Sequence, residues 1–570
     1  MAEEVWMLQT KKADFKQIGA RFRIDPVTAR IIRNRGIEGE AAIDRYLNGT
    51  LDDLYDPMLL KDMERAVSIL CEAVDTGKKI RIVGDYDIDG VCSTYILLQA
   101  FERLGSDVDF EIPDRIKDGY GINESIIEQA HADGVEVILT CDNGISAFHQ
   151  VELAKKYGMT VVITDHHEVP LDGEKEKIPP ADAVIDPKQA DCPYPFLEIC
   201  GAVVAYKLVQ VLYARRGVPQ MEWLDLLEFA AIATVGDVMK LQDENRILVK
   251  YGLKKMAQTK NLGLRRLAEK NNLDLGAITA YHIGFVIGPC LNAGGRLKTA
   301  KEALALLRAQ SEEEAERLAE ELKELNDTRK DMTEQGTEAA KLQVESWYQK
   351  DKVLVVFLPE CHESLAGIIA GRLREYYQKP AIVLTRGEEA VKGSGRSIDE
   401  YHMFKKLTEV SDLLLKFGGH PLAAGLSLEE KNIDEFRRRL NENAGLTEED
   451  FKAKVWIDVP MPVGYVTERL VRELSCLEPF GQGNEKPLFA EKSLRIRASR
   501  VLGRNRNVVK MTLEETDGHA IEALYFGDGT AFEEERAGRR EIDVVYYPDI
   551  NEYNGRKTLQ AVIRRYKFRG

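Results

Sequence analysis

The sequence predicts an α/β protein: a parallel-sheet domain and a second α/β domain joined by a long helix, with a small C-terminal β-barrel. Strand-like apolar runs alternate with helical segments between residues 80 and 190, which is typical of a parallel sheet with crossover helices. The same alternation returns near residue 352. Short strands separated by turns such as NRN and YNGRK follow from residue 455, as in small barrels.

Composition narrows the class of protein. The chain is 44% hydrophobic and 31% charged, which excludes a mainly disordered, fibrous or membrane-spanning protein. No apolar run reaches the roughly 18 residues of a membrane helix, and the acidic start MAEEVWMLQTKK does not resemble a signal peptide. The eight cysteines form no CxxC pair, which disfavours a zinc ribbon or a thioredoxin-type motif. We therefore expect a reduced, cytoplasmic protein.

The elements follow in a regular order. In the first α/β domain, strands are predicted at 80–83, 108–112, 135–141 and 160–165, with helices near 91–104, 123–132 and 145–157. Residues 200–345 are predicted to be helical, and a leucine stripe over 311–332 indicates a long connecting helix. The expected divisions are an N-terminal segment (1–50), a catalytic domain (51–250), a helical region (251–350), a second α/β domain (351–455) and the barrel (456–570).

Carboxylates crowd the end of the first predicted strand. Asp85, Asp87 and Asp89 follow the buried run IRIV, and Gly90 opens the next helix. In an open parallel sheet, ligands bind at the carboxyl ends of the strands. Three carboxylates at that edge repel each other unless a cation lies among them. Alone, the pattern fits an acidic turn with a helix N-cap equally well.

Two further strand ends add to this cluster. The third strand delivers Asp142, and the fourth delivers Asp165, His166 and His167. Carboxylates mixed with imidazole suit Mn²⁺, with Mg²⁺ as a substitute. So many ligands can hold two ions about 3.5–4 Å apart, a geometry that activates water and stabilises the leaving oxygen in phosphoryl hydrolysis. A zinc peptidase fits poorly because no HExxH is present.

The triplet at 165–167 resembles the motif that names the DHH phosphoesterase family. GSGRSI (393–398) and FGGHPLAAGLSL (417–428) resemble signatures of the domain associated with it. IGPCLNAGGRL (287–297) and PFGQGNEKPLF (479–489) resemble sequences of the single-strand-specific exonucleases of this family. The resemblance covers nearly the whole chain from about residue 50. It implies a DHH domain, a long helix, an associated α/β domain and an OB-type β-barrel, in that order.

The resemblance also implies roles for individual residues. The implied metal ligands are Asp87, Asp89, Asp142, His166 and Asp237, with Asp142 bridging two ions.

Other side chains are implied to act beside these ligands. His167 and His420 would contact the substrate phosphate as catalytic groups, and Asp165 is grouped with them. Asp165 and Asp85 would orient the ligands.

The glycine-rich GSGRS segment is implied to bind a terminal phosphate. Backbone N–H groups and a guanidinium suit that anion, and the implied residues are Ser394, Gly395, Arg396 and Arg296. The alternative is that these glycines only allow tight turns.

The activity implied is hydrolysis of phosphodiester bonds in single-stranded DNA, from 5′ to 3′, releasing mononucleotides in DNA repair and recombination. Two Mn²⁺ or Mg²⁺ ions are the expected cofactors. Single-stranded DNA, a single-strand-binding protein and a repair helicase are the expected partners of a monomer that does not bind membranes.

The distribution of charge supports a nucleic-acid partner. The net charge is −16, yet residues 492–510 and 555–570 contain basic residues and no acid. Small barrels bind single strands by combining a positive groove with aromatic stacking. The predicted nucleic-acid-binding residues are Arg495, Arg497, Arg504, Arg506, Arg564 and Arg565. The aromatic candidates, about half of which should fill the core, are Tyr525, Phe526, Tyr546, Tyr547, Tyr553, Tyr566 and Phe568.

Departures from the family pattern leave some points open. Cys290 stands where the family usually has arginine, which puts one phosphate contact or salt bridge in doubt, and Lys240 stands where proline is usual. Two alternatives remain: a DHH phosphodiesterase for short oligonucleotides or cyclic dinucleotides, and a DHH scaffold without activity. A manganese pyrophosphatase is disfavoured by the chain length and the barrel.

Overall fold

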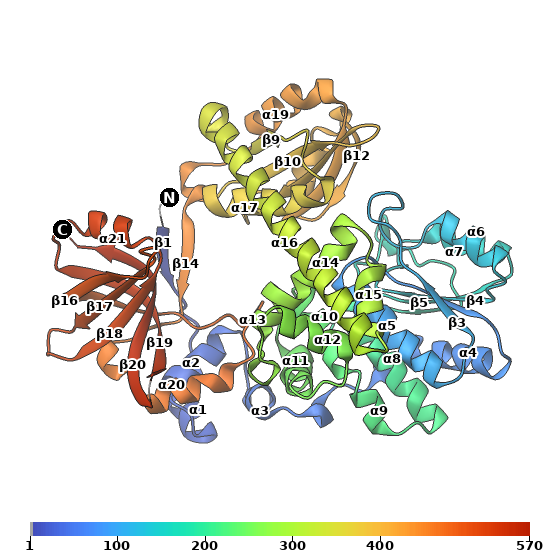
Figure 1. The fold of residues 1–570 in the computed structure, drawn as a ribbon, viewed down its shortest axis with the longest axis horizontal. Coiled ribbons are helices and arrows are strands. Elements are labelled where there is room, and N and C mark those ends of the chain that lie inside the picture. The colour runs from blue at the N-terminus through green and yellow to red at the C-terminus, as the bar shows by residue number, and fades with distance from the viewer. Residues whose placement is uncertain (1–3, 554, 570) are drawn as a thin grey trace. The chain divides into compact units, whose positions relative to one another are not determined.

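The computed structural model describes residues 4–553 and 555–569 (Figure 1). The chain forms two compact units. The first contains Tyr55–Met239 and Tyr251–Ala453, and the second contains Val5–Leu54, Lys240–Lys250 and Lys454–Gly570. Among the described residues, no helix combines the length and apolar character that a membrane span requires.

A five-stranded parallel sheet forms the centre of the first unit. Its strands are β2 (Ile80–Val83), β3 (Val108–Glu111), β4 (Val137–Cys141), β5 (Thr160–Thr164) and β8 (Ala183–Ile185). They lie in the order β3-β2-β4-β5-β8, and every neighbouring pair is parallel. The predicted parallel α/β fold is therefore confirmed. The strand order reverses between β2 and β4, the kind of position where open α/β sheets bind ligands.

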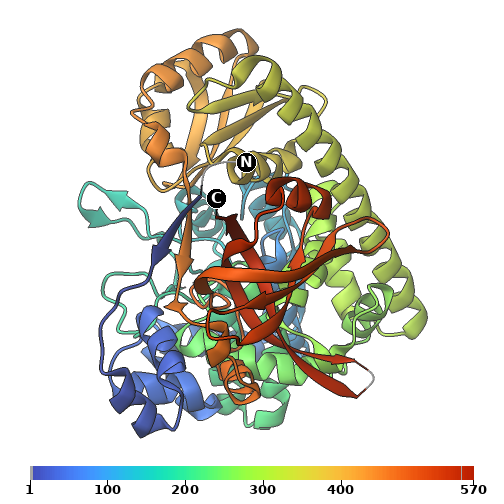
Figure 2. The ribbon, with the colours of Figure 1, turned by 90° about the vertical axis from the view of Figure 1, so that its left-hand side faces the viewer.

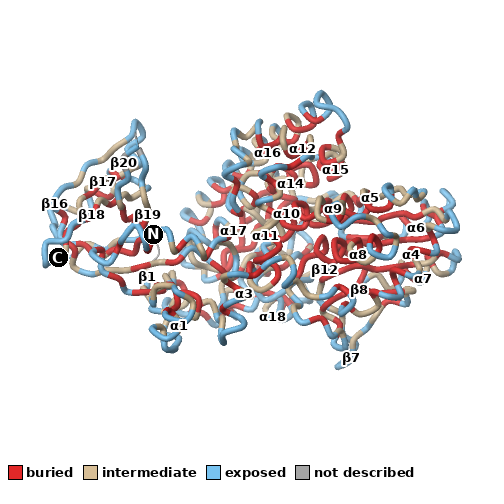
Figure 3. The backbone as a smooth tube through the Cα atoms, turned by 90° about the horizontal axis from the view of Figure 1, so that it is seen from below, coloured by how far each residue is buried: buried red, intermediate tan, exposed pale blue. Residues whose placement is uncertain are grey.

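Helices cover both faces of this sheet. They are α4 (Met63–Asp75), α5 (Ile88–Arg103), α6 (Glu124–Ala132), α7 (Phe148–Lys156), α8 (Gly201–Arg216), α9 (Gln220–Leu224) and α10 (Leu227–Gly236). Most residues of α5, α8 and α10 are buried, so these three helices are fixed on several sides (Figure 3). A small hairpin of β6 (Leu171–Asp172) and β7 (Lys175–Glu176) follows β5.

The region after α10 is helical, as predicted. Its helices are α11 (Asp243–Met256), α12 (Leu262–Lys270), α13 (Ala280–His282), a π-helix (Ile283–Ile287), α14 (Gly288–Leu297), α15 (Lys301–Arg308) and α16 (Glu312–Gln343). Ser311 caps α16 by accepting the N–H of Glu314. The helix has 32 residues and is about 48 Å long, so it extends beyond the predicted 311–332 and reaches the second sheet (Figure 2).

The second sheet contains β9 (Leu354–Phe357), β10 (Ala381–Arg386), β11 (Val391–Arg396), β12 (Leu414–Gly419) and β13 (Ala423–Leu428). Their order is β12-β13-β11-β10-β9, and the pairs are antiparallel except for β9 with β10. The helices of this domain are α17 (Ala366–Tyr377), α18 (Met403–Thr408) and α19 (Ile433–Glu442). The GSGR residues lie inside strand β11 and form no turn.

The second unit is built around six C-terminal strands. They are β15 (Val459–Pro460), β16 (Phe489–Leu502), β17 (Val508–Glu514), β18 (Ala520–Phe526), β19 (Glu541–Tyr553) and β20 (Arg556–Phe568). The order is β15-β16-β17-β18-β20-β19, and β16 also pairs with β19, so the pairings of five strands run in a closed circle. Two helices accompany them, α20 (Glu468–Leu474) and α21 (Gly529–Arg536).

The N-terminal segment belongs to this second unit. Strand β1 (Glu4–Leu8) pairs with β14 (Ala453–Ile457), and three helices follow, α1 (Phe15–Phe22), α2 (Pro26–Asn34) and α3 (Glu40–Asn48). Ile31 and Tyr46 from these helices share one hydrophobic core with the C-terminal strands. The buried Arg246 joins the pieces by donating to the backbone carbonyls of Tyr46, Cys476 and Leu477. Residues 5–50 are thus a structural partner of the C-terminal region.

Candidate active site

Acidic and histidine side chains meet at the carboxyl ends of β2, β4 and β5, beside the point where the strand order reverses. Asp87 is the N-cap of α5, and its Oδ1 accepts the N–H groups of Asp89 at 2.9 Å and Gly90 at 3.1 Å. The N-cap interpretation of this motif is therefore correct. It leaves the second carboxylate oxygen of Asp87 for another partner.

The start of α8 holds Asp89 in place. The two oxygens of Asp89 accept the backbone N–H groups of Gly201 and Ala202, each at 2.7 Å. The first N–H groups of α8 therefore orient this carboxylate, as helix N-termini do for anions. A Cβ on Gly201 would lie 2.7 Å from the Cβ of Asp142, so a glycine is required where α8 passes the cluster.

His166 lies at the centre of the cluster. Its Nε2 is 3.1 Å from Asp142 Oδ1, 3.4 Å from Asp89 Oδ2 and 3.8 Å from Asp237 Oδ2. Asp237 follows the last residue of α10, and Asp142 follows β4 with a left-handed φ of 60°. The structure thus brings four predicted ligands together from four separate segments of the chain.

Three overlapping sets of side chains have ligand atoms within 4.8 Å of one another. They are Asp85–Asp87–Asp142, Asp89–His166–Asp237 and Asp142–His166–His167. All five predicted metal ligands belong to these sets. Asp142 occurs in two sets, and Asp85, expected only to orient ligands, occurs in one.

The electrostatics of the cluster favour a cation. Burial raises the pKa of Asp142 well above its usual value, and the negative charges of Asp89, Asp87 and Asp85 raise it further. Burial, followed by the charges of Asp89 and Asp87, raises the pKa of Asp237 to about 8. In the part of the chain that the structure describes, no lysine or arginine lies within ion-pair distance of the carboxylates of Asp87, Asp89, Asp142 or Asp237.

The donor set therefore fits a divalent ion. Burial lowers the pKa of His166, so its imidazole is neutral and offers a nitrogen lone pair. Its Nδ1 is buried without a hydrogen-bond partner. Several carboxylates and one neutral imidazole are the ligands that suit Mn²⁺, and a mainly oxygen set also accepts Mg²⁺.

Asp165 orients His167. Its Oδ1 lies 2.7 Å from Nδ1 of His167, and its Oδ2 accepts the N–H of Ile145 at 2.9 Å. Burial lowers the pKa of His167, but the hydrogen bond and the charge of Asp165 outweigh it and raise the value to about 9. His167 is thus a positively charged donor at neutral pH, with 42% of its side chain exposed at the edge of the cluster.

Tyr120 is a member of the site that the sequence interpretation missed. Its hydroxyl donates to the backbone carbonyl of Asp142 at 2.8 Å and lies 3.1 Å from Nδ1 of His167. It belongs to the loop between β3 and α6. The signal that could have found it is the position of that loop, since β3 ends at the same edge of the sheet as β2.

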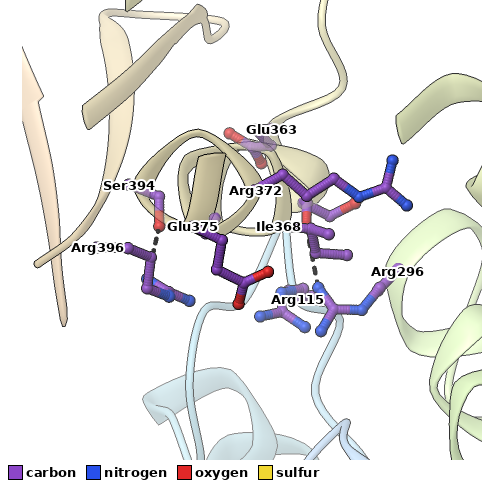
Figure 4. Close-up of a pocket in the computed structure, with 11 residues that line it drawn as sticks. Arg115, Arg296, Glu363, Ile368, Arg372, Glu375, Ser394 and Arg396 are labelled. Carbon is purple, nitrogen blue, oxygen red and sulfur yellow. Dashed lines mark hydrogen bonds between the residues drawn. The ribbon is translucent and has the colours of Figure 1, made fainter. Parts of the chain in front are cut away.

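A pocket of about 430 Å³ lies beside the cluster, between the two α/β domains of the first unit (Figure 4). Arg115 enters it from the loop after β3, Arg296 from α14, and Ser394 and Arg396 from β11. Arg296 Nη1 donates to the carbonyl of Ser364 at 3.0 Å. Burial and the nearby charges of Arg115 and Arg329 lower the pKa of Arg296 to about 10. Positive charge gathered in this way fits an anion such as phosphate.

The backbone of the GSGRS segment does not supply the pocket, contrary to expectation. Strand β11 is paired on both sides, with β10 and β13, which engages its N–H groups in the sheet. Side chains alternate along a strand, so Ser394 and Arg396 face the pocket while the open side of Gly395 faces Met403. Arg115, in contrast, was missed because it lies in a loop without a motif.

His420 lies apart from the cluster. It follows β12, its side chain is exposed, and its backbone N–H donates to Ala423 at 2.8 Å. Its charge contributes to the lowered pKa of Glu168, after the larger effect of Lys188, so it lies on the side of its domain that faces Glu168. Within the described residues it makes no hydrogen bond or ion pair with the cluster.

Cys290 performs a packing role. It is fully buried, and its Sγ lies 3.4 Å from Nδ2 of Asn326 on α16 and 3.8 Å from Nδ2 of Asn271. It is not among the residues that line the phosphate pocket. The presence of Cys290 in place of the family's usual arginine therefore does not change the lining of the phosphate pocket.

The six predicted arginines of the C-terminal region are all exposed. Arg497 forms an ion pair with Glu514, and Arg506 donates to Thr530 at 3.0 Å. Of the aromatic candidates, Tyr546 and Tyr547 are buried in the core, whereas Phe526 is 60% exposed. Tyr525, Tyr566 and Phe568 pack partly against the core. The side chain of Tyr553 lies outside the described residues.

Comparison with known proteins identifies the family. The chain matches the DHH family N-terminal domain over residues 79–234, the DHHA1 domain over 350–445 and the RecJ OB domain over 457–565. It is 36% identical to the single-stranded-DNA-specific exonuclease RecJ of Bacillus subtilis, over 98% of this chain and 70% of that protein. It is 33% identical to the RecJ of Haemophilus influenzae, over 96% of this chain and 97% of that protein. The chain belongs to the RecJ family.

The solved structures of the RecJ family agree with this assignment. A crystal structure of RecJ from Thermus thermophilus in complex with Mn²⁺ has a TM-score of 0.84 at 28% identity, covering 99% of this chain and 80% of that chain. A second, in complex with Mg²⁺, has a TM-score of 0.77 at 27% identity, covering 99% and 78%. The predicted order of DHH, associated and OB domains is confirmed.

Proposed function

We propose that this member of the RecJ family is a metal-dependent exonuclease that hydrolyses phosphodiester bonds in single-stranded DNA. It acts from 5′ to 3′, releases mononucleotides and serves DNA repair and recombination. The observation that carries the proposal is a buried cluster of carboxylates and imidazole, with no lysine or arginine of the described residues at ion-pair distance from the proposed carboxylate ligands, placed beside a pocket of arginines. The cluster fits divalent ions, and the arginine pocket fits the phosphate at the end of a DNA strand.

Asp87, Asp89, Asp142, His166 and Asp237 would hold two Mn²⁺ or Mg²⁺ ions, which would supply an activated water and offset negative charge on the phosphate.

The chain's own groups orient the reacting phosphate. His167, charged and fixed by Asp165, donates to a phosphoryl oxygen and stabilises its developing charge. His420 contacts substrate phosphate from the second domain. Tyr120 fixes the backbone of Asp142 and the ring of His167 relative to each other. It is therefore a positioning residue.

The arginine pocket selects the end of the strand. Arg115, Arg296 and Arg396, with Ser394, bind the 5′ phosphate and hold the next phosphodiester bond at the metal centre. A site that holds a terminal phosphate beside the reacting bond releases one nucleotide at a time. The 5′-to-3′ polarity follows from family membership. We also propose that the protein is a cytoplasmic monomer that cooperates with a single-strand-binding protein and a repair helicase.

The test uses single strands labelled at the 5′ or the 3′ end, incubated with Mn²⁺ and sampled over time. Wild-type protein should release labelled mononucleotide early from the 5′ label, and Asp142→Ala should abolish the release. Asp172→Ala, in the exposed β6–β7 hairpin, is the matched control and should leave it intact. Early release from the 3′ label would reverse the polarity, and cleavage of dinucleotides alone would favour an oligonucleotide phosphodiesterase.

A further inference from the structure

Two aromatic side chains stand exposed on the helical run that leads to the phosphate pocket. Tyr281, at the centre of α13, is 63% exposed, and Phe285, in the π-helix Ile283–Ile287, is 68% exposed. Their ring centroids are 4.8 Å apart and their planes differ by 26°, so the rings are stacked. Neighbouring aromatic rings left in water often mark a binding surface. Nothing in the proposed mechanism uses this pair.

The pair begins a stripe of side chains along one face of the run from α13 to α14. Residues three and four apart lie on the same face of a helix. The stripe consists of Tyr281, Phe285, Gly288, Asn292 and Arg296. Its ends are fifteen residues apart, which corresponds to about 22 Å. The π-helical turn beneath Phe285 is a feature that occurs frequently at functional sites.

The middle of the stripe passes the metal-binding cluster. Gly288 and Asn292 line a hollow of about 120 Å³ together with Gly236, the residue directly before Asp237. A Cβ on Gly288 would lie 3.3 Å from Ile88, which separates Asp87 from Asp89 in the sequence. The Oδ1 of Asn292 is buried without a hydrogen-bond partner, so it can accept one from a ligand.

The far end of the stripe enters the phosphate pocket. Arg296 lines both the hollow and the pocket, and Arg329 lines the hollow as well. Of the described residues, none with a carboxylate lines the hollow. The stripe therefore runs from aromatic rings, past small residues at the metal-binding cluster, to a concentration of positive charge. Grooves for single-stranded nucleic acid combine the same elements, cations for the backbone and aromatic faces for the bases.

We propose that Tyr281 and Phe285 form a stacking platform for bases of the single strand on the 3′ side of the scissile bond. The inference rests on the proposed exonuclease function, since Arg296 then fixes the 5′ end and the stripe continues away from it. The occupant is a nucleobase, because stacking accepts every base and the platform is continuous with a phosphate site. The platform lies about 16–22 Å along the helical run from Arg296, which is beyond the reach of a dinucleotide.

The first experiment measures binding of a 5′-phosphorylated 20-nucleotide strand in EDTA by fluorescence anisotropy. The double variant Tyr281→Ala/Phe285→Ala should bind about 10-fold more weakly than wild type. Phe285→Trp alone should retain the affinity, because indole stacks on bases as well as phenyl does. Trp347→Ala removes an aromatic side chain that is 70% exposed on a different π-helix, Val344–Tyr348, and should bind like wild type. Equal affinities of the double variant and wild type would overturn the platform.

The second experiment locates the platform on the strand. A single abasic site is moved one nucleotide at a time from the 5′ end. The affinity of wild type should fall when the abasic site occupies a few adjacent positions on the strand. The affinity of the double variant should show no such minimum. A minimum that persists in the double variant contradicts the assignment.

A third measurement separates this inference from the proposed function. The loss of kcat/KM in the double variant should be about 10-fold larger on the 20-nucleotide strand than on a 5′-phosphorylated dinucleotide. Equal losses on both substrates contradict the platform. A wild-type protein that hydrolyses neither substrate with Mn²⁺ refutes the proposed function itself, whatever the binding data show.

Discussion

At the scale of single residues, the side chains proposed to bind metal also hold the local fold. Asp87 caps α5, and Asp142 adopts a left-handed φ of 60° that aspartate tolerates better than most residues. Val238, directly after Asp237, has a φ of 58°, which is costly for a β-branched side chain. Strain and crowded like charge at one site reduce stability. The crowded negative charge also creates a strong preference for a bound cation.

Asp142→Asn tests whether the negative charge of the cluster lowers stability while it favours a bound cation. The change removes one buried negative charge from a group of like charges and keeps the shape of the side chain. In EDTA, the thermal midpoint should rise by about 2 °C or more. With Mn²⁺, the stabilisation seen in wild type should disappear, and the exonuclease rate should fall by about 100-fold or more. Thermal unfolding with and without Mn²⁺ measures the first two effects, and an undiminished response to Mn²⁺ would contradict the assignment of Asp142.

Tyr120→Phe tests a residue that supports the ligands from outside the cluster. Loss of the hydroxyl frees the carbonyl of Asp142 and the ring of His167. The Mn²⁺ concentration needed for half-maximal hydrolysis should rise by about 10-fold or more. Tyr157→Phe is the control, because Tyr157 stacks on His131 at a distance of 4.2 Å between ring centroids, in a different region of the domain. If both variants respond to Mn²⁺ alike, the hydroxyl has no such role.

At the scale of elements, rigid helices fix the geometry of the cluster. Asp87 caps the start of α5, α8 holds Asp89 with its first N–H groups, and Asp237 directly follows α10. All three are largely buried, so a change at one end of a helix is transmitted to the cluster. Gly201, where α8 passes Asp142, leaves no room for a side chain.

Glu228 on α10 makes the stability of this framework depend on pH. The side chain is buried; one oxygen accepts from Thr259 at 2.7 Å and the other has no partner. Burial raises its pKa from 4.5 to about 7. The folded protein therefore binds this proton more tightly than the unfolded chain does. The free energy of unfolding should fall as the pH rises from about 4.5 to about 7, by roughly 2–3 kcal/mol.

Glu228→Gln should remove that dependence. Urea unfolding at pH 8 should show the variant to be more stable than wild type, and at pH 5 the two should agree. Glu222→Gln is the control on a neighbouring helix. Its carboxylate is exposed and paired with Arg103, which lowers its pKa, so this variant should gain nothing at pH 8. A variant of Glu228 that is no more stable at pH 8 than wild type would show that the buried charge is compensated.

The elements that sequence predicted best are those with an unbroken local pattern. IRIV and VILTC are entirely buried strands, and their apolar runs are recognisable without tertiary information. Strand β8 has only three residues and is defined by pairing with β5, so no local pattern marked it. Tight turns were the alternative for the glycines of GSGR, but pairing with strands on both sides holds these residues in β11.

The residues of the site were likewise predictable only where a local sequence pattern marks them. Asp142 and the Asp-His-His triplet follow predicted strands, so their meeting could be foreseen from topology. Asp237 was found only through the family resemblance, because it follows a helix. Tyr120 and Arg115 lie in irregular loops, where the sequence gives no periodicity that indicates their direction. The role of residues 5–50 depends on contacts with a core more than 400 residues away in the chain.

At the scale of the whole molecule, charge is divided between the two units. The chain carries −16 overall, yet the C-terminal strands contain runs of basic residues without acids. Several of these arginines are already engaged in the fold: Arg497 pairs with Glu514, and Arg569 pairs with Asp543. Arg504 and Arg564 are exposed and form no ion pair or side-chain hydrogen bond with any residue that the structure describes. These two are therefore among the basic residues available for phosphates.

Replacement of Arg504 and Arg564 by glutamine should therefore weaken binding of long single strands whatever their sequence. Each phosphate contact on a single strand contributes about 0.7 to the slope of log affinity against log salt, so the double variant should lower the slope by about 1.4. Arg497→Gln should change it less, because its guanidinium is already neutralised by Glu514. The measurement is the dissociation constant of a labelled 30-nucleotide strand in EDTA between 50 and 300 mM NaCl. A slope that is unchanged in the double variant, or that falls most in Arg497→Gln, would mean that the basic face of the C-terminal strands does not bind the DNA backbone.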